Sequence, residues 1–136
     1  EPGLVLLLDL DNFKQINDVF GHIEGDNFLI ELAEKLRHFC RSTDVISRLG
    51  GDEFIIFMPS VKEQDIGPLV SRILNDIRKE YRKADVTSEV TASVGIAHYP
   101  VDGCSFAALY HCADLALYDA KRKGKNCYSK YQGTIL

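Results

Sequence analysis

Two adjacent glycines, Gly50 and Gly51, constrain the fold of this chain more than any other feature, because they separate two short apolar runs of strand length. The runs span residues 45–49 and 54–58. A Gly-Gly pair between such runs is typical of a tight β-hairpin, since glycine lets the backbone double back. Asp52 and Glu53 follow the glycines directly. We therefore expect two carboxylates at the tip of a hairpin, and few folding needs call for that arrangement.

A second acidic cluster ends the first predicted strand. Residues 4–8 are all apolar, which is typical of a strand buried on both faces, and Asp9, Leu10 and Asp11 follow them. If this strand lies beside the hairpin, Asp9 and Asp52 meet at one edge of the sheet. Two like charges about 4 Å apart repel by roughly 4 kcal/mol at an effective dielectric constant of about 20. Either one carboxylate then holds a proton or a cation lies between them.

A cation at this edge would have oxygen ligands only, because no His or Cys lies nearby in the sequence. Such ligands favour Mg²⁺ or Mn²⁺ over Zn²⁺, and Mg²⁺ normally also binds phosphate oxygens. The alternative is a polar turn with solvated acids. That alternative suits either cluster alone better than it suits both clusters in one chain.

The composition bounds the class of protein. The chain has 136 residues, of which 46% are hydrophobic, and this suits a single domain spanning 1–136. The longest apolar run near the start is too short to span a bilayer and follows no signal-peptide pattern, so we expect a cytoplasmic domain without membrane contact. The cysteines form no Cys-x-x-Cys pair and no ligand set with histidine, which indicates free thiols in a reducing compartment. They are Cys40, Cys104, Cys112 and Cys127.

The charge is small overall but unevenly distributed. A net charge of −4 argues against a general nucleic-acid binder. Residues 1–26 hold six acids and one lysine, whereas residues 121–136 hold five basic residues and no acid. Brought together, the two ends would bind a metal-bound polyphosphate.

The periodicity of the rest of the chain alternates between helix and strand without internal repeats or a flexible linker. Apolar residues fall on one helical face in 26–40, 65–81 and 106–120, and they alternate with small or polar residues in 90–96. The predicted order is β, α, β, β, α, β, α, β. This order indicates an α/β (α+β) fold with a central, mostly antiparallel sheet flanked by helices, related to the ferredoxin-like unit.

Five segments together resemble the GGDEF domain family, in the family's order and over nearly the whole chain. They are LDLDNFKQIND at 8–18, GHIEGD at 21–26, GGDEF at 50–54, TASVGIA at 91–97 and ALYDAK at 116–121. The resemblance implies a fold like the palm of nucleotide cyclases and polymerases. It also implies a diguanylate cyclase, a nucleotidyltransferase that joins two GTP molecules into the bacterial signalling nucleotide cyclic di-GMP and releases two pyrophosphates. Each domain of the family binds one GTP, so catalysis would require a homodimer.

For the metal, the resemblance implies the carboxylates of Asp9 and Asp52 and the main-chain carbonyl of Leu10. They would hold two Mg²⁺ or Mn²⁺ ions per active site, which bridge the triphosphate and stabilise the attacking alkoxide. Asp52 and Glu53 are the expected catalytic residues. Glu53 either completes the metal shell or helps to accept the proton of the 3′-hydroxyl, and the general base stays open between Glu53 and Asp52.

For the guanine base, the resemblance implies Asn17 and Asp26. An amide supplies both a donor and an acceptor, and a carboxylate accepts two N–H bonds from the guanine edge. Asp26 also has an alternative role, because it stands where a helix N-terminus is expected and would cap that helix.

For the phosphates, the resemblance implies Lys14, Lys121 and Lys125, together with the main-chain N–H groups of Asn12 and Phe13. Those N–H groups open a predicted helix, and helix N-termini suit anions. The alternative for the lysines is a solvated basic end. Many members of the family carry Arg at the position of Lys125. The lysine ammonium is a point charge and lacks the bidentate geometry of a guanidinium.

A regulatory site is implied by Arg41 and Asp44, which match the family's inhibitory Arg-x-x-Asp motif in sequence and in spacing from Gly50. A guanidinium binds phosphate or guanine acceptors and a carboxylate binds guanine donors, so the pair would hold the product cyclic di-GMP. Arg72 on the following helix would add a second arm. The alternative is that Arg41 neutralises a helix C-terminus and that residues 42–44 form a turn.

One part of the family pattern is missing, because members usually carry an Asp-x-Leu-Thr segment and a helix ahead of the first strand. The longer native chain would hold an upstream sensory or regulatory domain there. We therefore expect a product-inhibited diguanylate cyclase domain. The main alternative is a catalytically inactive module that binds GTP or cyclic di-GMP as a sensor. A polymerase relative acting on nucleic acid is disfavoured by the acidic net charge and the lack of a basic stripe with aromatic residues.

Overall fold

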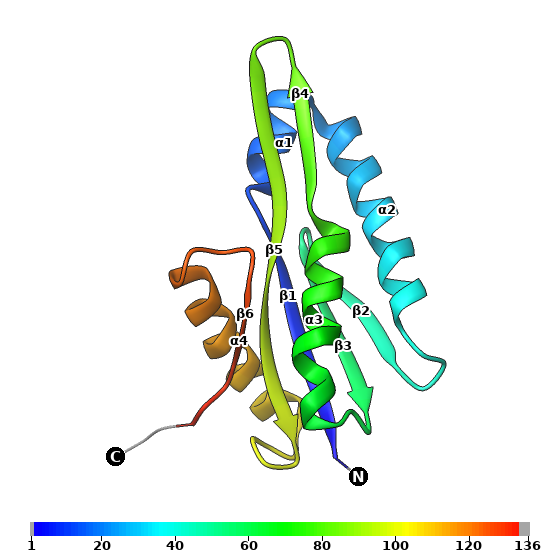
Figure 1. Ribbon diagram of the computed structural model, residues 1–136, viewed down its shortest axis with the longest axis vertical. Coiled ribbons are helices and arrows are strands. Elements are labelled where there is room, and N and C mark those ends of the chain that lie inside the picture. Colours follow the sequence, from blue (N-terminus) through cyan, green and yellow to red (C-terminus); the bar gives the residue numbers. More distant parts are fainter. Residues whose placement is uncertain (1, 134–136) are drawn as a thin grey trace.

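The computed structural model describes residues 2–133, which form a six-stranded sheet with helices on both faces (Figure 1). The elements in chain order are β1 (Gly3–Asp11), α1 (Phe13–Phe20), α2 (His22–Phe39), β2 (Val45–Gly50), β3 (Glu53–Pro59), α3 (Glu63–Ile77), β4 (Lys79–Lys83), β5 (Val86–Tyr99), α4 (Phe106–Arg122) and β6 (Tyr128–Lys130). The strand order is β2-β3-β1-β5-β4, and β6 pairs with β5. Only the β5–β6 pairing is parallel. The expected mostly antiparallel sheet flanked by helices is confirmed.

Strand β1 lies between β3 and β5 and is buried on both faces, as its apolar sequence predicts. Leu4, Leu6 and Leu8 belong to the core under α1, α2 and α3. Val5 and Leu7 alternate with them and pack under α4 on the opposite face. Because side chains alternate along a strand, Asp9 and Asp11 continue the row that faces α4. Each fully buried Leu of this strand stabilises the fold by about 1.5–3 kcal/mol.

The hairpin expected around Gly50 and Gly51 is confirmed, since β2 ends at Gly50 and β3 starts at Glu53. Neither glycine of this turn adopts a positive φ. Instead, the Arg48 guanidinium donates hydrogen bonds to the carbonyl oxygens of Gly50 and Gly51 and closes the turn. A Cβ atom added at either glycine would meet nothing within 4 Å. The turn therefore presents bare backbone beside the two carboxylates.

Two predicted helices have different bounds from those expected. Residues 13–20 form a separate helix α1, and the helix predicted to start at residue 26 starts at His22, because Gly21 breaks the chain direction with a φ of 96°. The helix predicted over 65–81 ends at Ile77. Tyr81 lies in β4 instead, opposite Ser88 of β5. Ile77 in α3 and Tyr81 in β4 pack into the same core. Their spacing in the sequence therefore looks helical although a strand has already begun.

Two findings within the described residues concern the cysteines and the helices. All four cysteines are free thiols. No helix in residues 2–133 is both long and apolar enough to cross a membrane. The predicted domain bounds of 1 and 136 lie outside the described residues, so the single-domain assignment stays a prediction.

Candidate active site

The end of β1 and the tip of the β2–β3 hairpin meet, as expected. Asp9 lies opposite Glu53 in the β1–β3 pairing, and the Leu10 N–H donates a 3.2 Å hydrogen bond to the Asp52 carbonyl. Burial raises the pKa of Asp52, and the Asp9 carboxylate, which lies within hydrogen-bonding reach, raises it further. The predicted repulsion between the two acidic clusters is therefore present in the fold.

Lys121 of α4 supplies the positive charge at this cluster. Its Nζ lies 3.0 Å from Asp9 Oδ2 and 3.0 Å from Asp11 Oδ1. Burial alone would lower the pKa of Lys121, but its hydrogen bonds and charge interactions with both carboxylates outweigh burial and raise that pKa. We expected either a proton or a cation between the acids. The structure combines a raised pKa at Asp52 with a lysine ammonium on Asp9.

Asp11 has the most complete set of hydrogen bonds in the cluster, although it is only 1% exposed. Its carboxylate accepts from Thr91 Oγ1 at 2.7 Å, Ser93 Oγ at 2.9 Å, Lys121 Nζ at 3.0 Å and the Asn126 N–H at 3.0 Å. Burial would raise the pKa of Asp11, but these hydrogen bonds together outweigh it and lower the pKa. Asp11 therefore joins β1 to β5, to α4 and to the loop after α4. Sequence reasoning did not assign it this structural role.

The Glu53 side chain lies on the α4 side of the sheet and has one hydrogen bond within residues 2–133. The Tyr110 hydroxyl donates to Glu53 Oε1 at 3.2 Å. Burial raises the pKa of Glu53, the Tyr110 hydrogen bond lowers it, and the charges of Asp9, Asp114 and Asp52 raise it again. The net result is a raised pKa. Sequence reasoning did not single out Tyr110, which lies in α4, 57 residues after Glu53 in the chain.

The donor set at this edge fits Mg²⁺ or Mn²⁺. Asp9 and Asp52 offer carboxylate oxygens, and Leu10 adds a main-chain carbonyl on the same strand end. Within residues 2–133, no group of three or more His, Cys, Asp or Glu side chains forms a metal site by itself. Mg²⁺ requires no such group, because one or two carboxylates together with substrate phosphates suffice. The crowded negative charge that raises the pKa of Asp52 is the condition that a divalent cation relieves.

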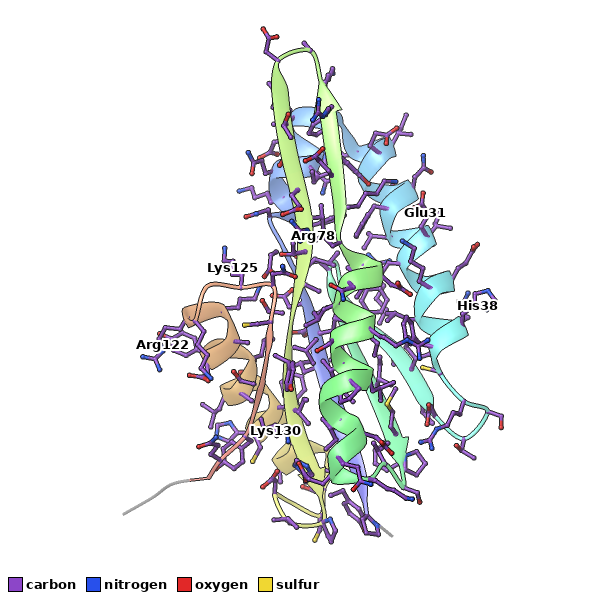
Figure 2. The ribbon with its side chains drawn as sticks, in the orientation of Figure 1. Glu31, His38, Arg78, Arg122, Lys125 and Lys130 are labelled. Carbon is purple, nitrogen blue, oxygen red and sulfur yellow. The ribbon has the colours of Figure 1, made fainter. Side chains whose placement is uncertain are left out.

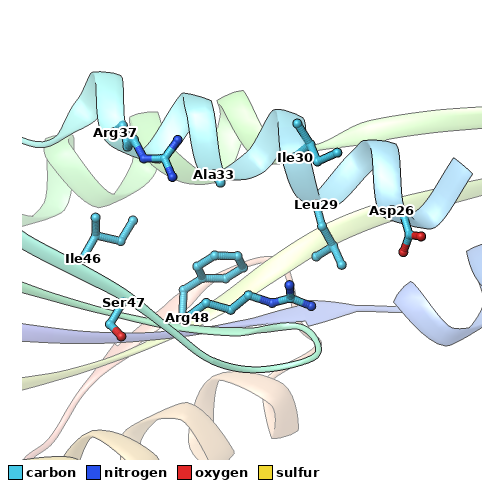
Figure 3. Close-up of a pocket in the computed structure, with 9 residues that line it drawn as sticks. Asp26, Leu29, Ile30, Ala33, Arg37, Ile46, Ser47 and Arg48 are labelled. Carbon is cyan, nitrogen blue, oxygen red and sulfur yellow. The ribbon is translucent and has the colours of Figure 1, made fainter. Parts of the chain in front are cut away.

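Asp26 lies on the wall of a cavity of about 560 Å³ between α2 and the hairpin (Figure 3). The lining residues are Asp26, Leu29, Ile30, Ala33 and Arg37 of α2, Ile46, Ser47 and Arg48 of β2, and Phe54 of β3. Figure 3 shows Asp26 and Arg48 on facing walls. The cavity is largely apolar, with a few charged groups, which suits a flat base with a polar edge. The alternative role of Asp26 as a helix cap is wrong, because α2 starts four residues earlier at His22.

Asn17, the other expected base-binding residue, lies in α1 against Gly25 of α2, the residue before Asp26. A Cβ atom at Gly25 would lie 1.8 Å from Asn17 Oδ1. Only glycine leaves room there for the Asn17 side chain. Sequence reasoning did not single out Gly25, because only the packing of α1 against α2 reveals the contact.

The expected phosphate-binding groups lie around the same sheet edge. Asn12 caps α1 with a φ of 65° and makes no side-chain cap hydrogen bond, and the exposed Lys14 follows in the first turn. The first N–H groups of a helix have no intrahelical partner. Lys121 contacts the carboxylates directly, and Lys125 is exposed in the loop whose Asn126 binds Asp11. Figure 2 shows Lys125 in this loop beyond the end of α4.

Arg41 and Asp44 bind each other in a turn that lies before β2. The Arg41 guanidinium lies 2.9 Å from Asp44 Oδ1, and the Arg41 N–H donates to Asp44 Oδ2 at 2.8 Å. The guanidinium also donates to the Pro59 carbonyl. The predicted turn is therefore present, and both side chains support it. Arg72 of α3 lies 5.1 Å above the Phe39 ring at the end of α2.

Comparison with known proteins connects this geometry to one family. The family model described as "Diguanylate cyclase, GGDEF domain" matches residues 1–127. The chain is 40% identical over 131 residues to the bifunctional diguanylate cyclase/cyclic di-GMP phosphodiesterase MucR of Pseudomonas aeruginosa, covering 96% of this chain and 19% of MucR. It is 41% identical over 120 residues to diguanylate cyclase DgcP of Escherichia coli, covering 88% of this chain and 35% of DgcP.

A solved structure has the same fold. The GGDEF domain of TpbB (YfiN) from Pseudomonas aeruginosa matches with a TM-score of 0.86 at 34% identity, over 98% of this chain and 84% of that one. The chain spans about a third or less of the length of the two curated relatives.

Proposed function

The chain belongs to the GGDEF domain family, and from this premise we propose that it is the catalytic domain of a diguanylate cyclase. Two copies, each holding one GTP, face each other. The 3′-hydroxyl of one GTP attacks the α-phosphorus of the other, a P–O3′ bond forms, and the bond to the pyrophosphate breaks. The same transfer in the opposite direction closes cyclic di-GMP and releases the second pyrophosphate.

One observation carries this proposal: the strand end that bears Asp9 meets the hairpin that bears Asp52, and their charges crowd each other. Asp9, Asp52 and the Leu10 carbonyl would hold two Mg²⁺ or Mn²⁺ ions, which polarise the α-phosphate and stabilise the alkoxide. Either Asp52 or Glu53 accepts the hydroxyl proton.

The base and the phosphates are assigned to separate parts of the site. Asp26, on the wall of the cavity, accepts from the guanine edge, and Asn17, which lies against the neighbouring Gly25, supplies an amide to the same base. Lys14, Lys121, Lys125 and the first N–H groups of α1 bind the phosphates. Lys121 balances Asp9 and Asp11 in the absence of a nucleotide, so its ammonium already lies where phosphate oxygens would arrive.

Arg41, Asp44 and Arg72 form the proposed inhibitory site for cyclic di-GMP. The Arg41 guanidinium retains exposed surface, since the side chain is 49% exposed, whereas the Asp44 side chain is 1% exposed. Arg41 is therefore the group that reaches product. Because the curated relatives are much longer than this chain, we also propose a sensory or regulatory domain elsewhere in the native protein.

The test is turnover by a forcibly paired domain. The domain is fused to a dimeric coiled coil and incubated with GTP and Mg²⁺, and cyclic di-GMP and pyrophosphate are quantified. We expect product from the wild type and none from Asp52→Ala. Product that persists in Asp52→Ala would refute the metal assignment.

The rival function is a sensor that binds GTP or cyclic di-GMP without turnover. The Arg41–Asp44 turn favours this function, because it is separate from the Asp9–Asp52 carboxylates and could bind a ligand without catalysis. The same assay separates the two functions. A paired wild type that binds GTP but releases no pyrophosphate would establish the sensor.

A further inference from the structure

Tyr110 is the only side chain in the described part of the chain that hydrogen-bonds to Glu53. Its hydroxyl donates to Glu53 Oε1 at 3.2 Å, and Glu53 Oε2 has no hydrogen-bond partner within residues 2–133. The two residues come from different layers, since Glu53 opens β3 and Tyr110 lies in the second turn of α4. The contact therefore depends on how α4 docks on the sheet.

The Tyr110 ring has apolar neighbours on two sides. The Phe106 ring, one turn earlier on α4, stacks on it with centroids 5.9 Å apart and an interplanar angle of 29°. Tyr110 also packs against the apolar cluster between α4 and the sheet, which includes Leu7 and Ile55. An aromatic side chain has only two torsions, so a ring held on two sides presents its hydroxyl at a defined point.

Glu53 needs such a contact because its neighbours repel it. Asp9, Asp52 and Asp114 all act on its carboxylate with like charge. Repulsion of this kind turns an unrestrained glutamate outward to solvent, away from Asp9 and Asp52. A neutral hydroxyl donor opposes that movement without adding a positive charge that would compete with a metal ion.

We propose that Tyr110 is a positioning residue, which holds Glu53 Oε1 so that Oε2 faces the cation bound by Asp9 and Asp52. The inference rests on the proposed cyclase function and deepens it. Tyr110 itself touches no substrate. Its effect passes entirely through Glu53, and this makes a double-mutant test decisive.

The test compares the paired wild type with Tyr110→Phe, which removes the hydroxyl and keeps the stacked ring. Mn²⁺ affinity is measured by electron paramagnetic resonance in the presence of a non-hydrolysable GTP analogue, and turnover is measured with GTP. We expect Mn²⁺ to bind roughly five- to tenfold more weakly, and kcat to fall by a similar factor with KM for GTP unchanged, as for a lost hydrogen bond to a charged group. Unchanged Mn²⁺ affinity overturns the inference, whatever happens to turnover.

Two further variants make the result specific. Tyr118→Phe removes a hydroxyl from the same helix at a side chain that is 69% exposed, and we expect it to behave as wild type. In a Glu53→Ala background, Tyr110→Phe should weaken Mn²⁺ binding no further. A full additional loss in that background would show that Tyr110 does not act through Glu53.

Failure of this inference and failure of the proposed function are distinguishable. If the wild type makes cyclic di-GMP and Tyr110→Phe matches it in Mn²⁺ affinity and in kcat, only the inference falls. If the wild type makes no product but Mn²⁺ affinity depends on Tyr110 through Glu53, the cyclase proposal falls and the positioning role stands.

Discussion

Lys121 binds the buried carboxylate of Asp11 at 3.0 Å, although 110 residues separate the two in the chain. The contact joins α4 to the end of β1, directly beside Asp9. Within residues 2–133, Lys121 is the only fully charged partner of Asp11, since Thr91, Ser93 and the Asn126 N–H are neutral donors. Lys121 therefore stabilises the fold in addition to any role with phosphate.

Replacing Lys121 should destabilise the domain in the absence of any nucleotide. Lys121→Met leaves a buried carboxylate without its cation, and we expect the free energy of unfolding to fall by about 1.5–3 kcal/mol. Urea denaturation in EDTA measures this. Lys123→Met is the matched control, because Lys123 pairs with Asp119 at the surface and an exposed pair contributes about 0–1 kcal/mol. Equal losses in the two variants would contradict the structural role of Lys121.

Stability should depend on pH through Asp11. Its folded-state pKa lies below the ordinary value of 3.8, so the charged form is favoured by folding. The resulting stability is present above the unfolded-state pKa and is lost as pH falls through the folded-state pKa. We expect the urea midpoint to fall as pH is lowered below about 4.

Thr91→Val provides the comparison for this pH dependence. It removes the 2.7 Å hydrogen bond to Asp11 and keeps the shape of the side chain. The pKa of Asp11 is then lowered less, so the acid loss of stability should be smaller in the variant. An identical pH profile in EDTA would show that Thr91 does not hold the charged form.

Gly25→Ala should weaken GTP binding without unfolding the domain. The added Cβ would lie 1.8 Å from Asn17 Oδ1, which is the end of a flexible side chain, so Asn17 moves and the helices stay. Alanine also favours helix over glycine by about 0.8–1 kcal/mol, which supports folding. We expect KM for GTP to rise roughly tenfold, as for one lost hydrogen bond to the base.

The Gly25 result is checked against Asn17→Ala. If Gly25 acts by holding Asn17, the two single variants should match in KM and the double variant should be no worse than either. Additive losses would mean that Gly25 contributes in some other way. Melting temperatures that stay near the wild type in all three variants exclude a general loss of folding.

Arg41→Ala should relieve product inhibition. Added cyclic di-GMP should slow the paired wild type and leave Arg41→Ala unaffected, because the exposed guanidinium is the proposed product ligand. The same variant removes hydrogen bonds to the buried Asp44, so we also expect about 1–2 kcal/mol lower stability. Arg72→Ala should weaken inhibition without that stability loss, since Arg72 contacts Phe39 and not Asp44. Equal inhibition of all three proteins would reject the site.

The sequence predicted those parts of the fold that depend on neighbours along the chain. The run 4–8 is apolar at every position, as expected for a strand covered on both faces, and β1 is such a strand. The hairpin followed from two glycines between apolar runs, although its turn is held by Arg48 and needs no positive φ. The meeting of Asp9 and Asp52 followed from placing both acids at one sheet edge.

What the sequence did not predict depends on contacts between distant residues. Asp11 acquires its partners from β5, α4 and the following loop, and no local pattern pairs an aspartate with Thr91 and Ser93. Tyr110 looks like any core aromatic until α4 is docked beside Glu53. Tyr81 shows the opposite error, because a helical spacing continued across a boundary into β4.

The bare turn at Gly50 and Gly51 separates two environments. Asp9, Glu53 and Tyr110 lie on the α4 side of the sheet, whereas the cavity bounded by Asp26 lies on the α2 side. In the proposed function, one nucleotide would contact both environments and would have to cross this turn. A Cβ atom at Gly50 or Gly51 would meet no protein atom within 4 Å, so in the proposed function the two glycines would leave room for the nucleotide rather than for the rest of the protein.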